Sequence, residues 1–335
     1  YEYKNLRIYN FIFMQKEIQI KKVIVWGHPL HSHTHSYIHN AFYTAFKELG
    51  YETHWFHDNM NTDHVDFANS LFITEHQVDK KIPRRNDCLY FVHFLEHDNY
   101  KDVDKKCLID LKCAFRDMKR DVSKNDILEF IPVTSKNLEF YSNVNQRLTY
   151  YTLWGTDLLP HEINENIKNL ETIKSKRTKN MYFVGQMSKP WILLHNMCKN
   201  SNIPFIKYGA TFNVNSQQNM DIKQNQDMTQ QSLISPAFQQ DDQIIDTYIP
   251  CRIFKNISYG RMGITNNPMV YELFNKKIIY DENILTAVNK SLHFEENYDN
   301  ELMKELMEYV RDNHTYIQRI ESMKTFINEH SGFIL

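Results

Sequence analysis

The sequence predicts an α/β chain built from two doubly wound halves. Strand-length apolar runs alternate with helical segments, a pattern typical of mostly parallel sheets covered by helices. A charged stretch at residues 164–180 interrupts the alternation, which then starts again, and a length of 335 residues allows two domains of ordinary size. We therefore expect domains at 1–165 and 166–300, followed by a C-terminal helix at 301–335 that packs back across both.

The first half begins with a strand, a helix and a second strand. "KKVIVWG" (21–27) predicts a buried strand, residues 36–50 place apolar side chains at helical spacing up to the C-cap residue Gly50, and "YETHWF" predicts the next strand. The alternation before residue 20 suggests a leading strand or hairpin, and this segment lacks the small-residue cleavage site of a signal peptide. Further strands are expected in "SLFITEH", "DCLYFVHFLEH" and "KNDILEFIPVT".

The second half repeats the pattern. "MYFVGQM" (181–187) predicts a strand, "PWILLHNMCKNSN" (190–202) a helix and "IPFIKYG" (203–209) the following strand. The polar run at 213–231 has too few apolar residues to pack well and predicts an exposed loop. Apolar residues at helical spacing predict one long helix over 300–327. Strands are also expected in "SLISPAF", "GIT" and "KKIIYD".

Composition excludes several classes of protein. A formal charge of -2 lacks the basic surplus of nucleic-acid-binding domains, and no apolar run approaches the ~20 residues of a membrane span. The cysteines are odd in number and show no CxxC spacing, so neither a disulfide framework nor a zinc ribbon is expected. A reducing, cytoplasmic setting fits these features. The five cysteines are Cys88, Cys107, Cys113, Cys198 and Cys251.

The stretch "YIPCRIFKNISYGRMGITNN" (248–267) holds the most informative charge. Pro250 stops the preceding segment, and a helix is expected from about residue 253 to 259, ended by Gly260. Arg252 then lies at the helix N-terminus, where unsatisfied N–H groups attract an anion and a guanidinium adds bidentate donors for phosphate. The stretch predicts a diphosphate site; a surface ion pair between Arg252 and a carboxylate is the alternative.

This stretch resembles the donor-binding segment of GT-B fold glycosyltransferases, especially the spore-maturation group, which carries a P-x-R-x-F-E-x-x-x-x-G pattern before a strand. "YYTLWGTDLLPHEI" (150–163) is similar to the interdomain segment of that group, and "NHTYIQRIESMKTFI" (313–327) to its C-terminal HTY-x-x-R helix. The resemblance implies two Rossmann-like domains facing a cleft. It also implies transfer of a sugar from a nucleotide diphosphate, held by the C-terminal domain, to an acceptor hydroxyl on a glycan, lipid or protein.

The resemblance assigns residues to the donor. Arg252 would contact the diphosphate, and Gly185 and Gln186 would lie near the phosphates on the first loop of the donor domain. The family often has a glutamate after the Phe to hold the ribose, but the residue here is Lys255, whose ammonium cannot accept hydroxyl protons. Either Lys255 binds phosphate instead, or Asn256 or a neighbour holds the ribose, or the donor differs.

Four further residues complete the expected donor site. Gly260 ends the helix that carries Arg252. Asn266 and Asn267 end a strand, where their amides could bind sugar hydroxyls or form a turn. Glu272 lies near the start of the next helix, where a carboxylate could bind ribose or stabilise the helix terminus. The residues of the HTY-x-x-R match are expected to pack and form hydrogen bonds across the domains: His314, Tyr316 and Arg319.

The histidine-rich segment "GHPLHSHTHSYIH" (27–39) follows the first strand and, in the GT-B interpretation, faces the cleft. Many inverting members keep the general base at the start of the first helix, so His35 is the expected base, with Asp98 to orient it. His35 as a helix cap is the alternative. Trp154 and Asp157 are expected at the floor of the cleft. An equally plausible alternative is that Trp154 is a buried core residue and Asp157 caps a helix. The expected acceptor-binding set is His28, His31, His33, Trp154 and Asp157.

Two other functions remain open. An H-x-H after a first strand can ligate a metal, as in barrel hydrolases that activate water. The chain lacks eight β/α units and an obvious second ligand cluster, so neither a metal ion nor another cofactor is expected beyond the nucleotide sugar itself. Lys255 at the family's carboxylate position instead fits a non-catalytic protein that binds nucleotide sugars or glycans.

Overall fold

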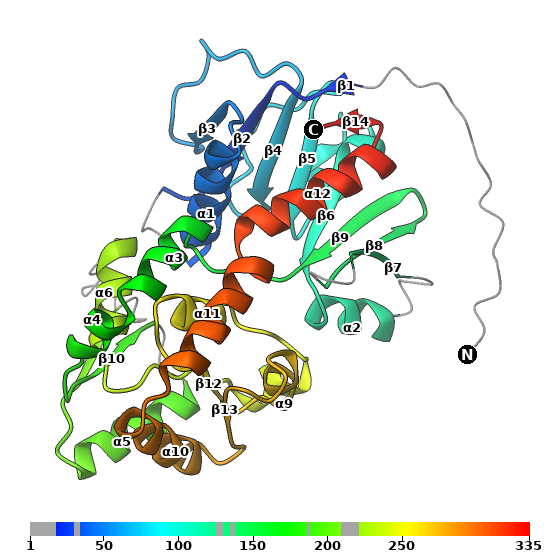
Figure 1. Cartoon of the computed structure of the whole chain (residues 1–335). Coiled ribbons are helices and arrows are strands. Elements are labelled where there is room, and N and C mark those ends of the chain that lie inside the picture. Colours follow the sequence, from blue (N-terminus) through cyan, green and yellow to red (C-terminus); the bar gives the residue numbers. More distant parts are fainter. Residues whose placement is uncertain (1–17, 30–33, 125–129, 135–137, 186–187, 209–220) are drawn as a thin grey trace.

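A computed structural model describes residues 18–29, 34–124, 130–134, 138–185, 188–208 and 221–335. An eight-stranded sheet dominates the first part of the fold (Figure 1). Six neighbouring strands are parallel, from β3 to β9, and β8 and β7 extend the sheet as antiparallel strands. In spatial order the strands are β3 (Thr53–Phe56), β2 (Lys22–Trp26), β4 (Ser70–Glu75), β5 (Leu89–His93), β6 (Leu108–Cys113), β9 (Arg147–Thr152), β8 (Glu139–Val144) and β7 (Ile131–Thr134).

The order of these strands fixes where a ligand crevice lies. The chain enters the sheet at β2, adds β3 on one side and then returns to place β4 on the other. Open α/β sheets bind ligands outside the carboxyl ends of the strands at such a reversal. The predicted α/β class and the mostly parallel first sheet are confirmed, and helix α1 (Thr34–Glu48) follows β2 as expected.

Helices α1 and α12 (Tyr316–His330) cover one face of this sheet, and α2 (Arg116–Ser123) contacts the other, where its Asp121 binds Lys112 and Tyr151. Helix α12 packs beside α1, and its Phe326 contacts the ring of Phe91 with centroids 6.1 Å apart. The neighbouring residue Tyr90 faces the other way and packs on Tyr100, at 5.8 Å. Tyr100 belongs to the connection between β5 and β6, which holds only two short 3₁₀ helices, η1 (His97–Tyr100) and η2 (Lys105–Cys107).

The predicted long C-terminal helix is two helices. Helix α11 (Asn300–Asn313) ends at His314, whose carbonyl accepts a hydrogen bond from Thr156 N at 2.9 Å. A Cβ on Gly155 would lie 2.5 Å from the same carbonyl oxygen, so glycine permits this approach. The chain then turns into α12 and returns to the large sheet, ending in β14 (Phe333–Ile334), which pairs with β1 (Ile18–Gln19).

The second part of the fold is a smaller α/β unit, at the lower left of Figure 1. Its strands form two parallel pairs, β10 with β11 and β12 with β13. The elements are α3 (Pro160–Lys168), α4 (Leu170–Ser175), β10 (Met181–Val184), α5 (Lys189–Asn200), β11 (Phe205–Tyr208), α6 (Ile222–Gln231), α7 (Asp241–Ile245), α8 (Cys251–Ser258), β12 (Ile264–Thr265), α9 (Pro268–Leu273), β13 (Ile279–Tyr280) and α10 (Ile284–Glu296), with α2 (Arg116–Ser123) in the first part.

Two expectations for this unit are wrong. "SLISPAF" is extended but is not a strand, because single backbone hydrogen bonds link it to each pair: Leu233 N to Asn180 O, and Ala237 N to Ile264 O. Residues 222–231 form α6 where an exposed loop was predicted; Asp221 caps this helix by accepting from Gln224 N at 2.7 Å. The earlier part of the polar run, residues 213–220, lies outside the described residues.

A buried charged pair anchors α12 to the large sheet. Arg319 donates to the carbonyl oxygens of Leu153 and Asn313, at 2.7 and 3.0 Å, and to Nδ1 of His314 at 2.9 Å. Its Nε lies 3.9 Å from the Glu139 carboxylate. Together with Tyr316, whose ring packs on that of Phe42 at 4.7 Å, these contacts confirm the expected packing of the HTY-x-x-R residues.

Glu139 makes the stability of the fold depend on pH. Burial raises the pKa of this carboxyl from 4.5 to about 7, more than the nearby Arg319 lowers it. Between these values the folded chain keeps a proton that the unfolded chain has lost, so the free energy of unfolding falls as pH rises, by roughly 3 kcal/mol across the interval. We expect Glu139→Gln to flatten this dependence in urea unfolding at pH 5 and pH 8.

The matched control is Glu301→Gln, which removes an exposed glutamate from α11. This variant should keep the pH dependence of the parent protein. An unchanged slope in the Glu139→Gln protein would contradict the assignment.

Candidate active site

Three histidines meet one buried carboxylate at the carboxyl edge of the large sheet. Glu75 ends β4 and its side chain is 1% exposed. His28, just after β2, places Nε2 at 2.8 Å from Glu75 Oε1, and His35, in the first turn of α1, contacts Oε2 through Nδ1. His93 ends β5 with Nδ1 at 4.0 Å from Oε2. Adjacent parallel strands thus bring these groups together at the reversal between β2 and β4.

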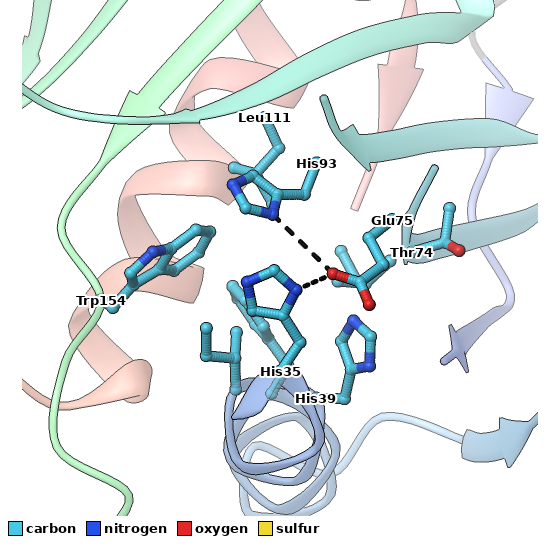
Figure 2. Close-up of a pocket in the computed structure, with 10 residues that line it drawn as sticks. His35, His39, Thr74, Glu75, His93, Leu111 and Trp154 are labelled. Carbon is cyan, nitrogen blue, oxygen red and sulfur yellow. Dashed lines mark ion pairs between the residues drawn. The ribbon is translucent and has the colours of Figure 1, made fainter. Parts of the chain in front are cut away.

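His35, Glu75 and His93 line a small pocket (Figure 2). The ring of His93 stands edge-to-face against His35 and Trp154, with centroids 4.8 and 5.2 Å apart. Burial lowers the pKa of His93 to about 4, so this imidazole is neutral at pH 7. Apolar side chains close the rest of the pocket: Ile38, Phe42, Ile73 and Leu111.

The pair of His35 and Glu75 has the geometry of a general base. A carboxylate beside Nδ1 accepts the proton of that nitrogen and fixes the tautomer, so Nε2 keeps a lone pair that can take a proton. The sequence predicted His35 in this place but assigned the orienting carboxylate to Asp98. In the structure Asp98 is exposed on η1, and the carboxylate in contact with His35 belongs to Glu75.

Sequence reasoning missed Glu75 because "SLFITEH" was interpreted only as a strand. A signal was present: a carboxylate ends a strand that neighbours the histidine-rich segment, and all six residues of that strand are buried. A buried carboxylate needs partners, and histidines are the nearest candidates. His93 was missed for the same reason, as the last residue of an apolar strand.

The expected acceptor-binding residues fall into three groups. Trp154 lines the pocket described above, and His28 contacts Glu75 beside it. His31 and His33 lie outside the described residues. Asp157 is buried and faces the second part of the fold instead, where it accepts from Lys255 Nζ at 2.8 Å and from the Tyr259 hydroxyl at 2.6 Å.

Arg252 lies in the first turn of α8, as the sequence predicted. Its Nη2 donates to Val184 O at 2.8 Å, and the guanidinium lies over the rings of Phe183 and Trp191, 5.0 and 5.3 Å from their centroids. No carboxylate of the described residues forms an ion pair with it, and burial lowers its pKa. A half-buried guanidinium held in this way is ready for an anionic ligand.

Gly185 directly adjoins this arginine, as expected. It ends β10 with φ at +139°, and a Cβ there would lie 2.9 Å from Nη2 of Arg252. Glycine therefore permits both the backbone conformation and the close approach of the guanidinium. Gln186, the other residue assigned to this loop, lies outside the described residues.

Lys255 connects the two parts of the site. It lies on α8 one turn beyond Arg252, and besides its ion pair with Asp157 its Nζ lies 4.9 Å from the ring centroid of Tyr37. Tyr37 follows His35 by two residues on α1. Burial disfavours the ammonium, but the Asp157 carboxylate outweighs it and the pKa of Lys255 is raised. The turn that carries Arg252 is thereby fixed against the helix that carries His35.

The remaining predicted donor residues make contacts within the protein. Asn256 is buried and donates to Ser235 O at 2.6 Å, and Asn266 exchanges two hydrogen bonds with the backbone of Gln239. Asn267 caps α9 by accepting from Met269 N at 2.9 Å, as in the predicted turn. Gly260 lies at the end of α8 opposite Arg252. Glu272 is exposed and pairs with Lys276 at 3.1 Å.

Comparisons with known proteins identify no family. No model of a protein family matches the chain, and no curated protein matches it. Among solved structures, an alpha,alpha-trehalose-phosphate synthase (UDP-forming) from Burkholderia xenovorans, in complex with glucose-6-phosphate, is 8% identical, with a TM-score of 0.48 over 88% of this chain and 78% of that one. An alpha1,3-fucosyltransferase is 11% identical, with a TM-score of 0.37 over 94% and 91%. Neither TM-score reaches 0.5, so the geometry of this chain must carry any functional assignment.

Within the described residues, each helix is too short or too polar to cross a membrane.

Proposed function

We propose that the protein is a GT-B glycosyltransferase that moves a sugar from a nucleotide diphosphate to an acceptor hydroxyl. One observation carries the proposal: a histidine with an orienting carboxylate lies on α1, a guanidinium without a described carboxylate partner lies on α8, and these two helices are in contact. The contact between Lys255 and Tyr37 joins the helices that carry them. A base and an anion-binding group on opposite sides are what sugar transfer requires.

The reaction follows from these two groups. Nε2 of His35 takes the proton of the acceptor hydroxyl while Glu75 holds Nδ1, and the acceptor oxygen attacks the anomeric carbon of the donor. The bond between that carbon and the phosphate oxygen breaks, and its electron pair leaves with the diphosphate. Arg252 and the first N–H groups of α8 stabilise the departing charge, because Pro250 offers no side-chain cap to occupy them. A base acting in this way implies inversion at the anomeric carbon.

Lys255 has a structural use that fits an active enzyme. At the position where the resembling family has a glutamate, the ammonium neutralises Asp157 and joins α8 to α1. Lys255 in place of a glutamate was the main reason to consider a non-catalytic binding protein. Because Lys255 has this structural use, its presence does not require that the chain has lost activity. The ribose then needs another carboxylate, and we assign that role to the exposed Glu272 on α9.

Nucleotide-sugar screening tests the proposal. The chain should be melted with UDP, GDP and ADP sugars, and with CMP sugars as a matched control because these carry a single phosphate. We expect one diphosphate series to raise the melting temperature, since a ligand at 100 times its Kd adds about 2.7 kcal/mol to the free energy of unfolding. The same series should release free nucleoside diphosphate slowly in the presence of the protein. A chain that responds to no diphosphate sugar in either assay would contradict the proposal.

A further inference from the structure

We propose that His35, Glu75 and His93 bind a divalent transition-metal ion, and that the bound ion inhibits sugar transfer. The proposal that these residues bind a metal ion depends only on their own geometry and burial. The inhibition rests on the proposed function, because it concerns the nitrogen atoms of the catalytic histidine.

The three side chains form a compact set of ligands. One ligand atom from each lies within 4.8 Å of the other two. Two ligands of a four-coordinate zinc ion, at 2.0–2.1 Å from it, are separated by about 3.3 Å, so His93 Nδ1, now 4.0 Å from Glu75 Oε2, needs only a small movement. Figure 2 shows the two imidazoles turned toward the carboxylate from β5 and α1. The cluster is therefore close to a binding geometry.

The burial of the cluster gives a second reason to expect a ligand. Glu75 is 1% exposed and His93 is 5% exposed. A buried carboxylate needs a charged or hydrogen-bonded partner, and a cation held between Glu75 and Nδ1 of His93 would supply one. Exposed clusters of charged residues have no such requirement, because water satisfies them.

The donor atoms select the kind of ion. Two imidazoles and one carboxylate suit zinc and its neighbours in the first transition row, whereas calcium and magnesium prefer shells of oxygen atoms. His28 contacts the other oxygen of Glu75 and lies outside this compact set of three ligands. Three protein ligands and one further ligand, such as water, would complete a tetrahedral site.

Metal binding and proton transfer compete for the two nitrogens of His35. In the base, Nδ1 carries the proton toward Glu75 and Nε2 keeps its lone pair. An ion on Nδ1 displaces that proton, and the neutral ring then carries its proton on Nε2. That nitrogen can no longer accept the proton of the acceptor hydroxyl, so the ion blocks the reaction without entering it.

Zinc binding tests the first half of the proposal. Protein made without a histidine tag should bind one zinc ion per chain in equilibrium dialysis, and His93→Gln should weaken binding at least tenfold. His54→Gln is the matched control, because His54 also lies 2.9 Å from a glutamate, Glu52, but is exposed and belongs to no three-ligand cluster of the described residues. Equal affinity in the His93→Gln and parent proteins would overturn the site. The site would also be overturned if a His31→Gln, His33→Gln double variant lost zinc binding while the His93→Gln variant kept it.

Cobalt provides a measurement that does not depend on whether a variant folds. Cobalt(II) added to the parent protein should show the intense visible bands of a tetrahedral site, and zinc should abolish them. The weak bands of an octahedral ion would contradict the tetrahedral site.

Transfer assays with added zinc test the second half. Turnover should fall with the same zinc dependence as binding. Zinc that binds but leaves turnover unchanged would overturn the inhibition, and zinc that stimulates turnover would overturn it as well. If zinc binds as expected but no donor is ever turned over, the metal site stands and the proposed function fails.

Discussion

Replacing His35 with Gln should lower the turnover of sugar transfer by about 10²–10⁴-fold, the range that a positioned general base contributes. The amide can still fill the space of the ring and contact Glu75, but it cannot accept the acceptor proton. Donor affinity should be unchanged, because His35 contacts Glu75 on the large sheet, whereas Arg252 contacts Val184 at the end of β10. Initial rates at saturating donor and calorimetry with the nucleoside diphosphate measure the two effects separately.

Two carboxylates provide the matched comparison for this prediction. Glu75→Gln removes the acceptor of the Nδ1 proton and should also lower turnover, and it should shift the pH profile of kcat because the base is altered through its partner. Asp98→Asn changes the carboxylate that the sequence had assigned to this role, although it is exposed on η1. If Asp98→Asn were as harmful as Glu75→Gln, the assignment from the structure would be wrong.

The sequence predicted those elements whose hydrophobic pattern agrees with their packing. The parallel strands β2, β4 and β5 are buried along their whole central length, so their apolar runs identify them. The break between α11 and α12 was missed because the apolar spacing continues through it. A local signal was present, because Thr315 and Gln318 form a capping box at the start of α12. The approach of Gly155 to the His314 carbonyl, a contact between segments far apart in the chain, could not be seen in the sequence.

The same distinction applies to the site. Arg252 and His35 were predictable because each lies at the start of a helix, a local feature with a known chemical consequence. The carboxylate partner of His35 was not, because Glu75 reaches this histidine through the topology of the sheet. α6 is the clearest failure: its polar surface suggested a loop, yet Asn225 and Gln230 are buried and the Asp221 cap compensates for the weak helical pattern.

Replacing Arg252 with Ala should weaken the binding of the nucleoside diphosphate by about 10²-fold while the fold survives. Hydrogen bonds to charged groups contribute about 1.5–3 kcal/mol each, and the guanidinium is the charged donor assigned to the phosphates. The fold should tolerate the change because the structure shows one hydrogen bond from this side chain, to Val184 O, and ring contacts. Calorimetry with the diphosphate and with the free nucleoside separates phosphate binding from base binding. Only the first should weaken.

Gly185→Ala tests the same contact from the other side. Its Cβ would lie 2.9 Å from Nη2 of Arg252, at a φ of +139° that disfavours alanine, so the guanidinium must move even though its charge remains. We expect diphosphate affinity to fall in this variant too, and the effect of combining it with Arg252→Ala to be less than additive, because both act on one interaction. If the nucleoside loses as much affinity as the diphosphate in either variant, Arg252 holds the loop rather than the phosphates.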